Sequence, residues 1–454
     1  MSRKFYLTIS ISMAIFVLAA LMAFLQPSQP AAAQPAAQND EPDSAHIVVQ
    51  FASGDALVRQ IDFTAPISGL AALEASGLDV VTKDFVWGTA VCSIEGVGCP
   101  AENCFCSGNF WGNSYWDGSA WQPYMVGATD TELNDGAVDG WQWGTGADPI
   151  PPAPQFLAAQ TALDWLLPHQ VYTTGGYGTH SSSVEVLLDA GANHTKAADW
   201  RQEPSARSLL DYFILRGYQY ANQSADRAGK LALGMSAAQG CWPLSGMTPL
   251  DYYSPTSGAF GPGASSQAFA MLGTNALSQT VPEAAVQYLK DLSEDDGGWA
   301  WLPGLESGSD TNSTSLAVQA LIANGEPLTA SAVISGLNFL KSAQNPDGGF
   351  TYDPDSIYGT DSDTNSTAYA VQAIWAAGQD PLTGTWVISN TNPVSYLLSM
   401  QLEDGSFEWQ SGFGSNLLAT QQAIPALLGK AFPFQVSTLE TCPGSMLYLP
   451  LIQH

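Results

Sequence analysis

The chain is 454 residues long and strongly acidic, with 42 Asp and Glu side chains against 13 Lys and Arg and a formal net charge of −29. Binding a phosphate backbone or an anionic membrane face requires clustered cations, which so acidic a composition does not supply. Nucleic acid is therefore excluded as a partner. The charge itself favours either solubility outside the cell or capture of a cationic ligand.

The first residues have the order of a secretory signal. Two cations, Arg3 and Lys4, precede an uncharged apolar run over residues 5–25, and small residues at 31–33 supply a cleavage site. We expect residues 1–33 to be removed and the protein to be extracellular or at the cell surface. The apolar run is also long enough to span a bilayer, so an uncleaved N-terminal anchor is the alternative and the one membrane contact expected.

Residues 34–45 are a Pro-, Ala- and Asp-rich linker with too little apolar content to fold. From position 46 the pattern predicts a small N-terminal α+β domain, rich in β-structure, over residues 46–147. A stiff proline linker at 148–154 ends it, because consecutive prolines continue neither helix nor sheet. The expected elements are strands over 46–51, 57–63 and 86–94, a helix over 68–76, and a hairpin-like end built from 121–126 and 138–143.

Six cysteines in an exported chain favour disulfides over metal thiolates. Four of them crowd into residues 92–106 without the paired spacing of a zinc site, and we expect two bridges among them. Cys241 and Cys442 stand apart, and a bridge between them would tie the C-terminal tail, residues 435–454, to the helical body.

Residues 155–434 are helical in pattern, and one cassette recurs three times near their end. Each copy has an aromatic-Leu pair, then a glycine turn with an aromatic residue, as at Gly348-Gly349-Phe350, then a polar stretch and an Ala-rich helix. The unit is a pair of helices that must stack on other pairs to bury its apolar faces. We predict a mainly α protein with five or six such pairs, closed into a ring because an open array needs polar caps. The expected helices are 155–167, 181–192, 205–220, 223–239, 264–276, 281–293, 312–324, 330–343, 365–378, 392–402 and 415–430.

This cassette resembles the repeats of the α/α-toroid superfamily, which contains terpene cyclases, prenyltransferase β-subunits and cobalamin carriers of the transcobalamin type. The resemblance covers residues 155–434 and is most specific after Gly261. The N-terminal domain resembles the small β-rich domain that those carriers place after the ring, although here it comes first. The resemblance implies an α/α toroid that binds cobalamin or a related corrinoid between the ring and the small domain.

Cyclases of this superfamily protonate an alkene with the middle carboxyl of a D-x-D-D-T-A motif, which requires an acid in an apolar pocket. The matching stretch begins at Asp363 and puts Asn365 at the acid position, and the sister unit also has an Asn there, Asn312. Because an amide cannot donate that proton, we lean against an enzyme. The zinc site of the prenyltransferases is unsupported too, since Cys241, the one cysteine in the repeats, has no His beside it.

The remaining candidates form a recognition surface. Aromatic side chains after the glycine turns would meet a flat or apolar ligand, and amides and hydroxyls at the helix starts would orient it, although the same Ser, Thr and Asn residues serve routinely as N-caps. Aromatic residues of the small domain would stack on a sugar or a corrin, while others form its core. The residues are Trp301, Tyr352, Tyr358, Trp409, Asn312, Asn365, Thr314, Thr367, Trp116, Trp121 and Tyr124.

A calcium ion is the metal that the loop between the last two cassettes suggests. Asp353, Asp355, Asp361 and Asp363 offer hard oxygen atoms at alternate positions, but the glycine of an EF-hand loop is missing. His180, in a loop before a helix, is the histidine placed to reach a ligand metal.

The sequence thus predicts an exported binding protein for a small molecule or glycan, with cobalamin as the leading ligand by resemblance. Two alternatives stay open. One is a toroid enzyme, terpene cyclase-like or active on polysaccharides, and the other is an adhesion module for which the toroid is a scaffold.

Overall fold

The computed structural model describes residues 42–52, 55–64, 66–145, 150–302 and 308–443. The expected signal at 1–33 and the apolar end of the tail lie outside the described residues. From Asp43 on, the described chain belongs to one compact unit.

The N-terminal part of this unit is β-rich. A five-stranded sheet has the order β2-β1-β8-β6-β7, in which β1 runs antiparallel to β2 and parallel to β8. A smaller sheet has the order β3-β4-β5. The elements are β1 (Asp43–Ala52), β2 (Asp55–Phe63), α2 (Gly69–Ala75), β3 (Val80–Phe85), β4 (Gly88–Ile94), β5 (Val97–Gly98), β6 (Phe110–Trp116), β7 (Trp121–Pro123) and β8 (Ala137–Gly144).

Alternation of apolar side chains along β1 and β2 buries Ile47, Val49 and Leu57 with Trp141 of β8 in one core. Strand β1 begins at Asp43, inside the range expected to be a linker. Strand β6 was not expected, because its sequence FWGNSYW has Gly and Asn in place of a β-branched run. Pairing with both β7 and β8 makes it a strand.

The three disulfides agree with expectation. Cys92–Cys104 and Cys99–Cys106 cross-link the smaller sheet and the segment after it, and Cys241–Cys442 joins the tail to the helical body. Next to that last bridge, the backbone N–H of Trp242 donates to the carbonyl of Glu440 at 2.8 Å.

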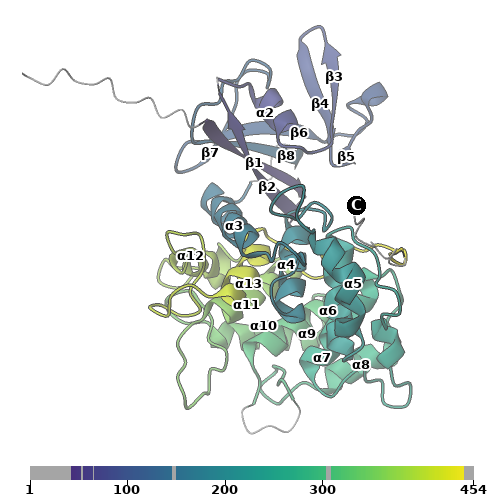
Figure 1. Cartoon of the computed structure of the whole chain (residues 1–454). Helices are drawn as coiled ribbons and strands as arrows, with labels where there is room; N and C mark the ends of the chain where they lie inside the picture. The colour runs from purple at the N-terminus through teal and green to yellow at the C-terminus, as the bar shows by residue number, and fades with distance from the viewer. Residues whose placement is uncertain (1–41, 53–54, 65, 146–149, 303–307, 444–454) are drawn as a thin grey trace, which may run out of the picture. The chain divides into compact units, whose positions relative to one another are not determined.

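In the described part of the chain, eleven α-helices follow, drawn from blue through green to yellow in Figure 1. Their limits lie close to the expected ones. Helix α5 starts later than expected because Ser208 and Asp211 form a capping box at its amino end. The helices are α3 (Ala153–Leu166), α4 (His180–Ala192), α5 (Leu209–Ala221), α6 (Ala225–Ala237), α7 (Ala264–Ala276), α8 (Glu283–Asp291), α9 (Thr311–Ala323), α10 (Ser331–Ala343), α11 (Thr364–Ala376), α12 (Pro393–Ser399) and α13 (Leu417–Leu427).

These helices close into a ring. The inner helices α4, α6, α7, α9, α11 and α13 contact one another in that order, and α13 returns to α4. The outer layer consists of α3, α5, the 3₁₀ segment η3 (Pro249–Tyr252), α8, α10 and α12. The ring therefore has six pairs, as predicted, with a 3₁₀ turn as one outer member.

Small residues let the inner helices approach closely. A Cβ atom on Gly273 of α7 would lie 2.3 Å from the Cα atom of Gly229 of α6, which no side chain tolerates. The inner helices run in the same direction, because like ends meet. Ser265 and Ser313 hydrogen-bond at 2.9 Å between the amino ends of α7 and α9, and Asn275 donates to the carbonyl of Ala323 at their carboxyl ends.

The β-rich region contacts the carboxyl ends of the inner helices. The Asn193 side chain, just after α4, accepts from Val58 N–H at 2.9 Å and donates to Val58 C=O at 3.0 Å, both within β2. Asp55 pairs with Lys430, which follows α13, and with His194. Burial favours a higher pKa for Asp55, but the hydrogen bonds and charges of His194 and Lys430 hold its pKa well below the usual range.

Candidate ligand-binding site

The amino ends of the inner helices carry the polar residues that the sequence singled out. Asp310 and Asp363 are the N-caps of α9 and α11, and each accepts a hydrogen bond from the backbone three residues on. Burial raises the pKa of Asp310 to about 6, although the hydrogen bonds from Ser313 act to lower it. Burial also raises the pKa of Asp363. The capping role therefore belongs to these two carboxylates.

Thr314 and Thr367 lie in the core, with hydroxyl groups that are occupied. Their Oγ1 atoms each accept from the backbone N–H of the turn aromatic, Trp299 or Phe350, at 2.9 Å. Thr420 repeats this bond with Phe407 at 2.8 Å. In each cassette, a hydrogen bond from the backbone N–H of the turn aromatic to a threonine hydroxyl therefore holds the glycine turn against its inner helix. This contact explains why these residue types recur in the cassette.

The ring axis is polar. Glu185 of α4 and Lys230 of α6 form an ion pair there, and Lys230 also reaches Tyr369 of α11. Burial disfavours the charged Lys230, yet Glu185 and the neighbouring tyrosines raise the pKa of Lys230, so the ammonium group stays charged. Burial raises the pKa of Tyr369 to about 12.

Asn365, at the position of the cyclase acid, faces the same axis one turn before Tyr369. Its amide donates to Oε1 of Gln422 of α13 at 2.6 Å. Asn312 holds the corresponding place on α9, and its Oδ1 atom is buried without a hydrogen-bond partner among the described residues. Further along the axis, toward the carboxyl ends of the inner helices, the backbone N–H of Phe432 donates to Oε1 of Gln319 at 2.9 Å. This contact closes the interior of the ring at that end.

The loop aromatics Trp301, Tyr352, Tyr358 and Trp409 are on the surface, with 57, 46, 95 and 39% of their areas exposed. Two of them connect neighbouring repeats through the backbone, because the carbonyl groups of Tyr352 and Trp409 accept hydrogen bonds from the backbone N–H groups of the first residues of α9 and α11. Side chains at this end of the ring are therefore accessible to a ligand.

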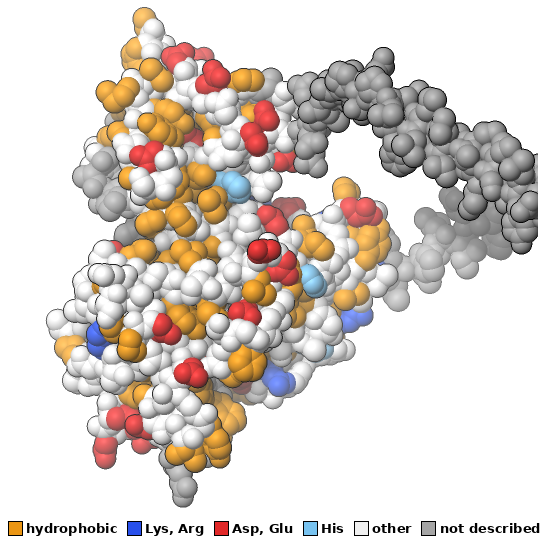
Figure 2. Space-filling view, turned by 90° about the vertical axis from the view of Figure 1, so that its left-hand side faces the viewer, with side chains coloured by type: hydrophobic (Ala, Val, Ile, Leu, Met, Phe, Trp, Pro, Cys, Tyr) orange, Lys and Arg blue, Asp and Glu red, His pale blue; other side chains and the backbone are white. Residues whose placement is uncertain are grey.

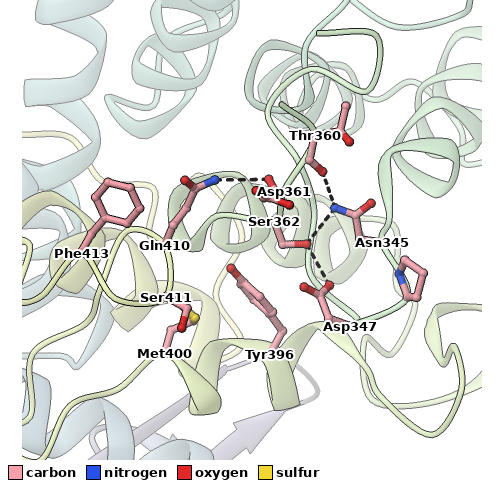
Figure 3. Close-up of a pocket in the computed structure, with 11 residues that line it drawn as sticks. Asn345, Asp347, Thr360, Asp361, Ser362, Tyr396, Met400, Gln410, Ser411 and Phe413 are labelled. Carbon is pink, nitrogen blue, oxygen red and sulfur yellow. Dashed lines mark hydrogen bonds between the residues drawn. The ribbon is translucent and has the colours of Figure 1, made fainter. Parts of the chain in front are cut away.

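A cleft of about 550 Å³ opens between the α10–α11 loop, α12 and the α12–α13 loop (Figure 3). Two carboxylates, two amides, four hydroxyl groups and two aromatic rings line it. The residues are Asn345, Pro346, Asp347, Thr360, Asp361, Ser362, Tyr396, Met400, Gln410, Ser411 and Phe413.

One wall of the cleft is fixed by its own hydrogen bonds. Asn345 donates to Thr360 C=O at 2.7 Å and to Ser362 Oγ at 3.0 Å, and Ser362 donates to Asp347 at 2.8 Å. Phe413 stands on the other side and is 69% exposed. Its ring packs on Trp409 with centroids 5.4 Å apart, so Trp409 supports the cleft although it does not line it.

The other expected site residues lie elsewhere. Trp116 and Trp121 pack edge to face at 5.5 Å, and Trp121 donates to Pro151 C=O at 2.9 Å, next to the start of α3. Tyr124 is close to the buried Asp139. Burial, together with this carboxyl group, raises the pKa of Tyr124. These residues belong to the β-rich region, which contacts the carboxyl ends of the inner helices, whereas the loop aromatics lie at their amino ends.

The four carboxylates expected to hold calcium do not converge. Asp363 caps α11, Asp353 accepts from the backbone of Asp355 at 2.9 Å, and Asp361 lines the cleft. Within the described ranges, no group of three or more His, Cys, Asp or Glu side chains is placed to hold a metal ion.

The described helices also include none long and apolar enough to cross a membrane.

Sequence reasoning missed most of the cleft. Asp361 was singled out, but for calcium, and Asn345, Asp347, Tyr396, Gln410 and Phe413 were not. Tyr396 is the aromatic residue of an aromatic-Leu pair, and Asp347 directly precedes a glycine turn, so the repeat pattern accounts for both positions without a ligand. The exposed Phe413 in the glycine-flanked stretch Gly412-Phe413-Gly414 was the one available signal, because a large ring between two glycines has no helix or strand to pack on.

The chain is similar to known proteins over parts of its length. Drimenyl diphosphate synthase of Streptantibioticus cattleyicolor is 36% identical over 94 residues, which is 21% of this chain and 17% of that protein. The chain therefore spans less than a fifth of this relative's length. Among solved structures, the type II terpene cyclase MstE from Scytonema has a TM-score of 0.42 at 11% identity, over 61% of this chain and 98% of that one. Haptocorrin in complex with Cbi has a TM-score of 0.38 at 15% identity, over 64% and 70%.

A family model also matches within the repeats. The match is to the squalene-hopene cyclase C-terminal domain and covers residues 261–418, where the cassette is most regular. With six helix pairs closed into a ring, the helical region is an α/α toroid whose residues 261–418 carry terpene cyclase-type repeats.

Proposed function

We propose that this protein is an exported binding protein that holds a saccharide in the cleft of Figure 3. The observation that carries the proposal is the lining of that cleft. Sugars present hydroxyl groups around a flat, partly apolar ring, and they are met by amides, carboxylates and an aromatic face. Gln410, Asp361 and Phe413 offer these three kinds of group from an accessible surface.

Cyclisation of a polyprenyl chain is disfavoured by two features of the ring. The acid position is Asn365, whose amide donates to Gln422, and an amide of this kind has no proton to give to an alkene. The axis next to it holds the Lys230–Glu185 pair, and a hydrocarbon placed there would strip water from charges without replacing its hydrogen bonds. We therefore expect no turnover of squalene-like or polyprenyl substrates. Turnover that Asp363→Asn abolishes would contradict this.

Cobalamin, the ligand implied by resemblance, is the second candidate. A shared site requires the loop aromatics and the small-domain aromatics to meet one ligand. The contacts of β2 with Asn193 and Lys430 instead put the small domain at the carboxyl ends of the inner helices. Cobalamin binding would therefore use one surface alone, and it is detected by a visible spectrum that survives washing.

The test is binding of the full exported chain to an array of immobilised glycans, followed by calorimetry with the best one. Phe413→Ala should weaken binding about 5- to 10-fold, which is the loss expected for about 1 kcal/mol of ring stacking. Leu328→Ala is the matched control, since Leu328 is 49% exposed but follows α9 at the other end of the ring. Equal losses for both variants, or no glycan bound, would refute the saccharide assignment.

A further inference from the structure

Two arginines and a histidine gather near the amino ends of α4 and α6, in a different part of the ring from the cleft. His180 is the first residue of α4, and its Nδ1 atom hydrogen-bonds with Tyr212 Oη at 2.7 Å. The Arg216 guanidinium lies over the ring of Tyr212 at 5.4 Å. Arg227, in the first turn of α6, lies over the ring of Tyr220 at 5.7 Å.

The two tyrosines bring these three side chains together. The His180 ring is 5.7 Å from Tyr212 and 6.5 Å from Tyr220, so it lies between the two arginine-tyrosine stacks. Burial and the charges of the two arginines lower the pKa of His180, which favours a neutral imidazole beside the two guanidinium groups.

The arginines have no acidic partner, which is unusual in so acidic a chain. The ion pairs of the described residues involve Lys230, Lys290, Lys430 and His194, and neither Arg216 nor Arg227 has a carboxylate within 4.0 Å. Opposite charge is abundant elsewhere, and the face drawn in Figure 2 carries more acidic than basic side chains. Within the described residues, Arg216 and Arg227 are therefore without a direct ion pair.

Both arginines are half-buried, and no hydrogen bond from either guanidinium group to another described residue is recorded beside its contact with a tyrosine ring. The N–H edge of a guanidinium group matches the two oxygen atoms of a carboxylate or phosphate group. The first turn of α4 contributes in the same sense, because the amino end of a helix favours negative charge. Lys230 lies one turn further along α6, but Glu185 already neutralises it.

We propose that His180, Arg216 and Arg227 bind the carboxylate or phosphate group of a small ligand at the amino-terminal rim of the toroid. Two arginines with a neighbouring imidazole suffice for one anionic group but not for a nucleic acid backbone, which agrees with the exclusion made from the composition. The site shares no residue with the saccharide cleft, so either assignment can fail without the other.

Isothermal titration of the full chain with inorganic pyrophosphate and, separately, with citrate tests the proposal at constant ionic strength. Arg216→Gln and Arg227→Gln should each weaken binding of the better probe about 10-fold, as expected for a lost charge-assisted hydrogen bond. Arg207→Gln should change it less than about 2-fold, because Arg207 is an exposed arginine just before the opposite end of α5. Preference for pyrophosphate or for citrate identifies the group as phosphate or carboxylate.

A second measurement needs no variant of the arginines. In the imidazole NMR spectrum of the wild-type chain, the signal of His180, assigned with His180→Gln, should shift on addition of the better probe, and those of His46 and His169 should stay in place. The proposal is overturned by equal affinity of all three arginine variants, by absence of binding to both probes at millimolar concentration, or by an unmoved His180 signal.

Discussion

Asp139 gives the stability of the β-rich region a pH dependence that one substitution should remove. This carboxyl group is fully buried on β8, and burial raises its pKa to about 7 against the hydrogen bonds from Asn113 and Trp141. In the unfolded chain its pKa is close to 3.8. The folded state therefore keeps its proton at pH values where the unfolded state has lost it.

The sign and size follow from linkage. The contribution of Asp139 to stability is complete below pH 3.8 and falls as the pH rises toward 7, where the folded carboxyl also ionises. A shift of roughly three pH units at 1.36 kcal/mol each corresponds to about 4 kcal/mol lost between pH 4 and pH 8. Full burial means that solvent screening removes little of this.

Asp139→Asn mimics the protonated form. Asn113 Oδ1 is buried without a partner among the described residues, so the Asn113 amide can turn over and accept from the amide that the substitution introduces, while Trp141 Nε1 keeps an acceptor. The assay is denaturant unfolding followed by tryptophan fluorescence at pH 4.5, 6 and 8, for both proteins. Between pH 4.5 and pH 8 the free energy of unfolding of the variant should rise relative to that of wild type by about 3 kcal/mol. A difference that does not change with pH would refute the reasoning.

Three further predictions concern the toroid and its tail. Lys230→Met leaves Glu185 buried without its partner and should lower the free energy of unfolding in urea by about 3 kcal/mol. The double variant with Glu185→Gln should recover much of this loss. An unchanged free energy of unfolding for the single variant would contradict a buried ion pair. Thr367→Val removes the acceptor for Phe350 N–H and should cost about 2 kcal/mol by the same assay, whereas Thr367→Ser should lose much less of this hydrogen bond. Replacing Cys241 and Cys442 by Ser should lower stability by about 3 kcal/mol, because the bridge restricts the unfolded chain across 201 residues; equal urea midpoints for oxidised wild type and this variant would count against it.

The sequence determined the toroid because its signal is local and repeated. Alanine-rich runs at helical spacing, each preceded by a glycine turn, specify a helix pair in every copy, and a pair with unburied apolar faces must stack. The limits of α4 and α9 therefore lie close to the expected ones. Cysteine spacing predicted two bridges within the local cluster and one between Cys241 and Cys442, but it did not determine which cysteines of the cluster pair.

The tertiary structure decided what the ring is lined with and where its sites lie. Lys230 and Glu185 are 45 positions apart, and closure of the ring brings them together across neighbouring inner helices. The cleft joins Asn345 to Phe413 from different pairs, and the rim joins His180 to Arg227 through tyrosines of α5. Such sites depend on contacts between loops and helices far apart in the chain, and periodicity carries no information about those contacts, because it describes each helix alone.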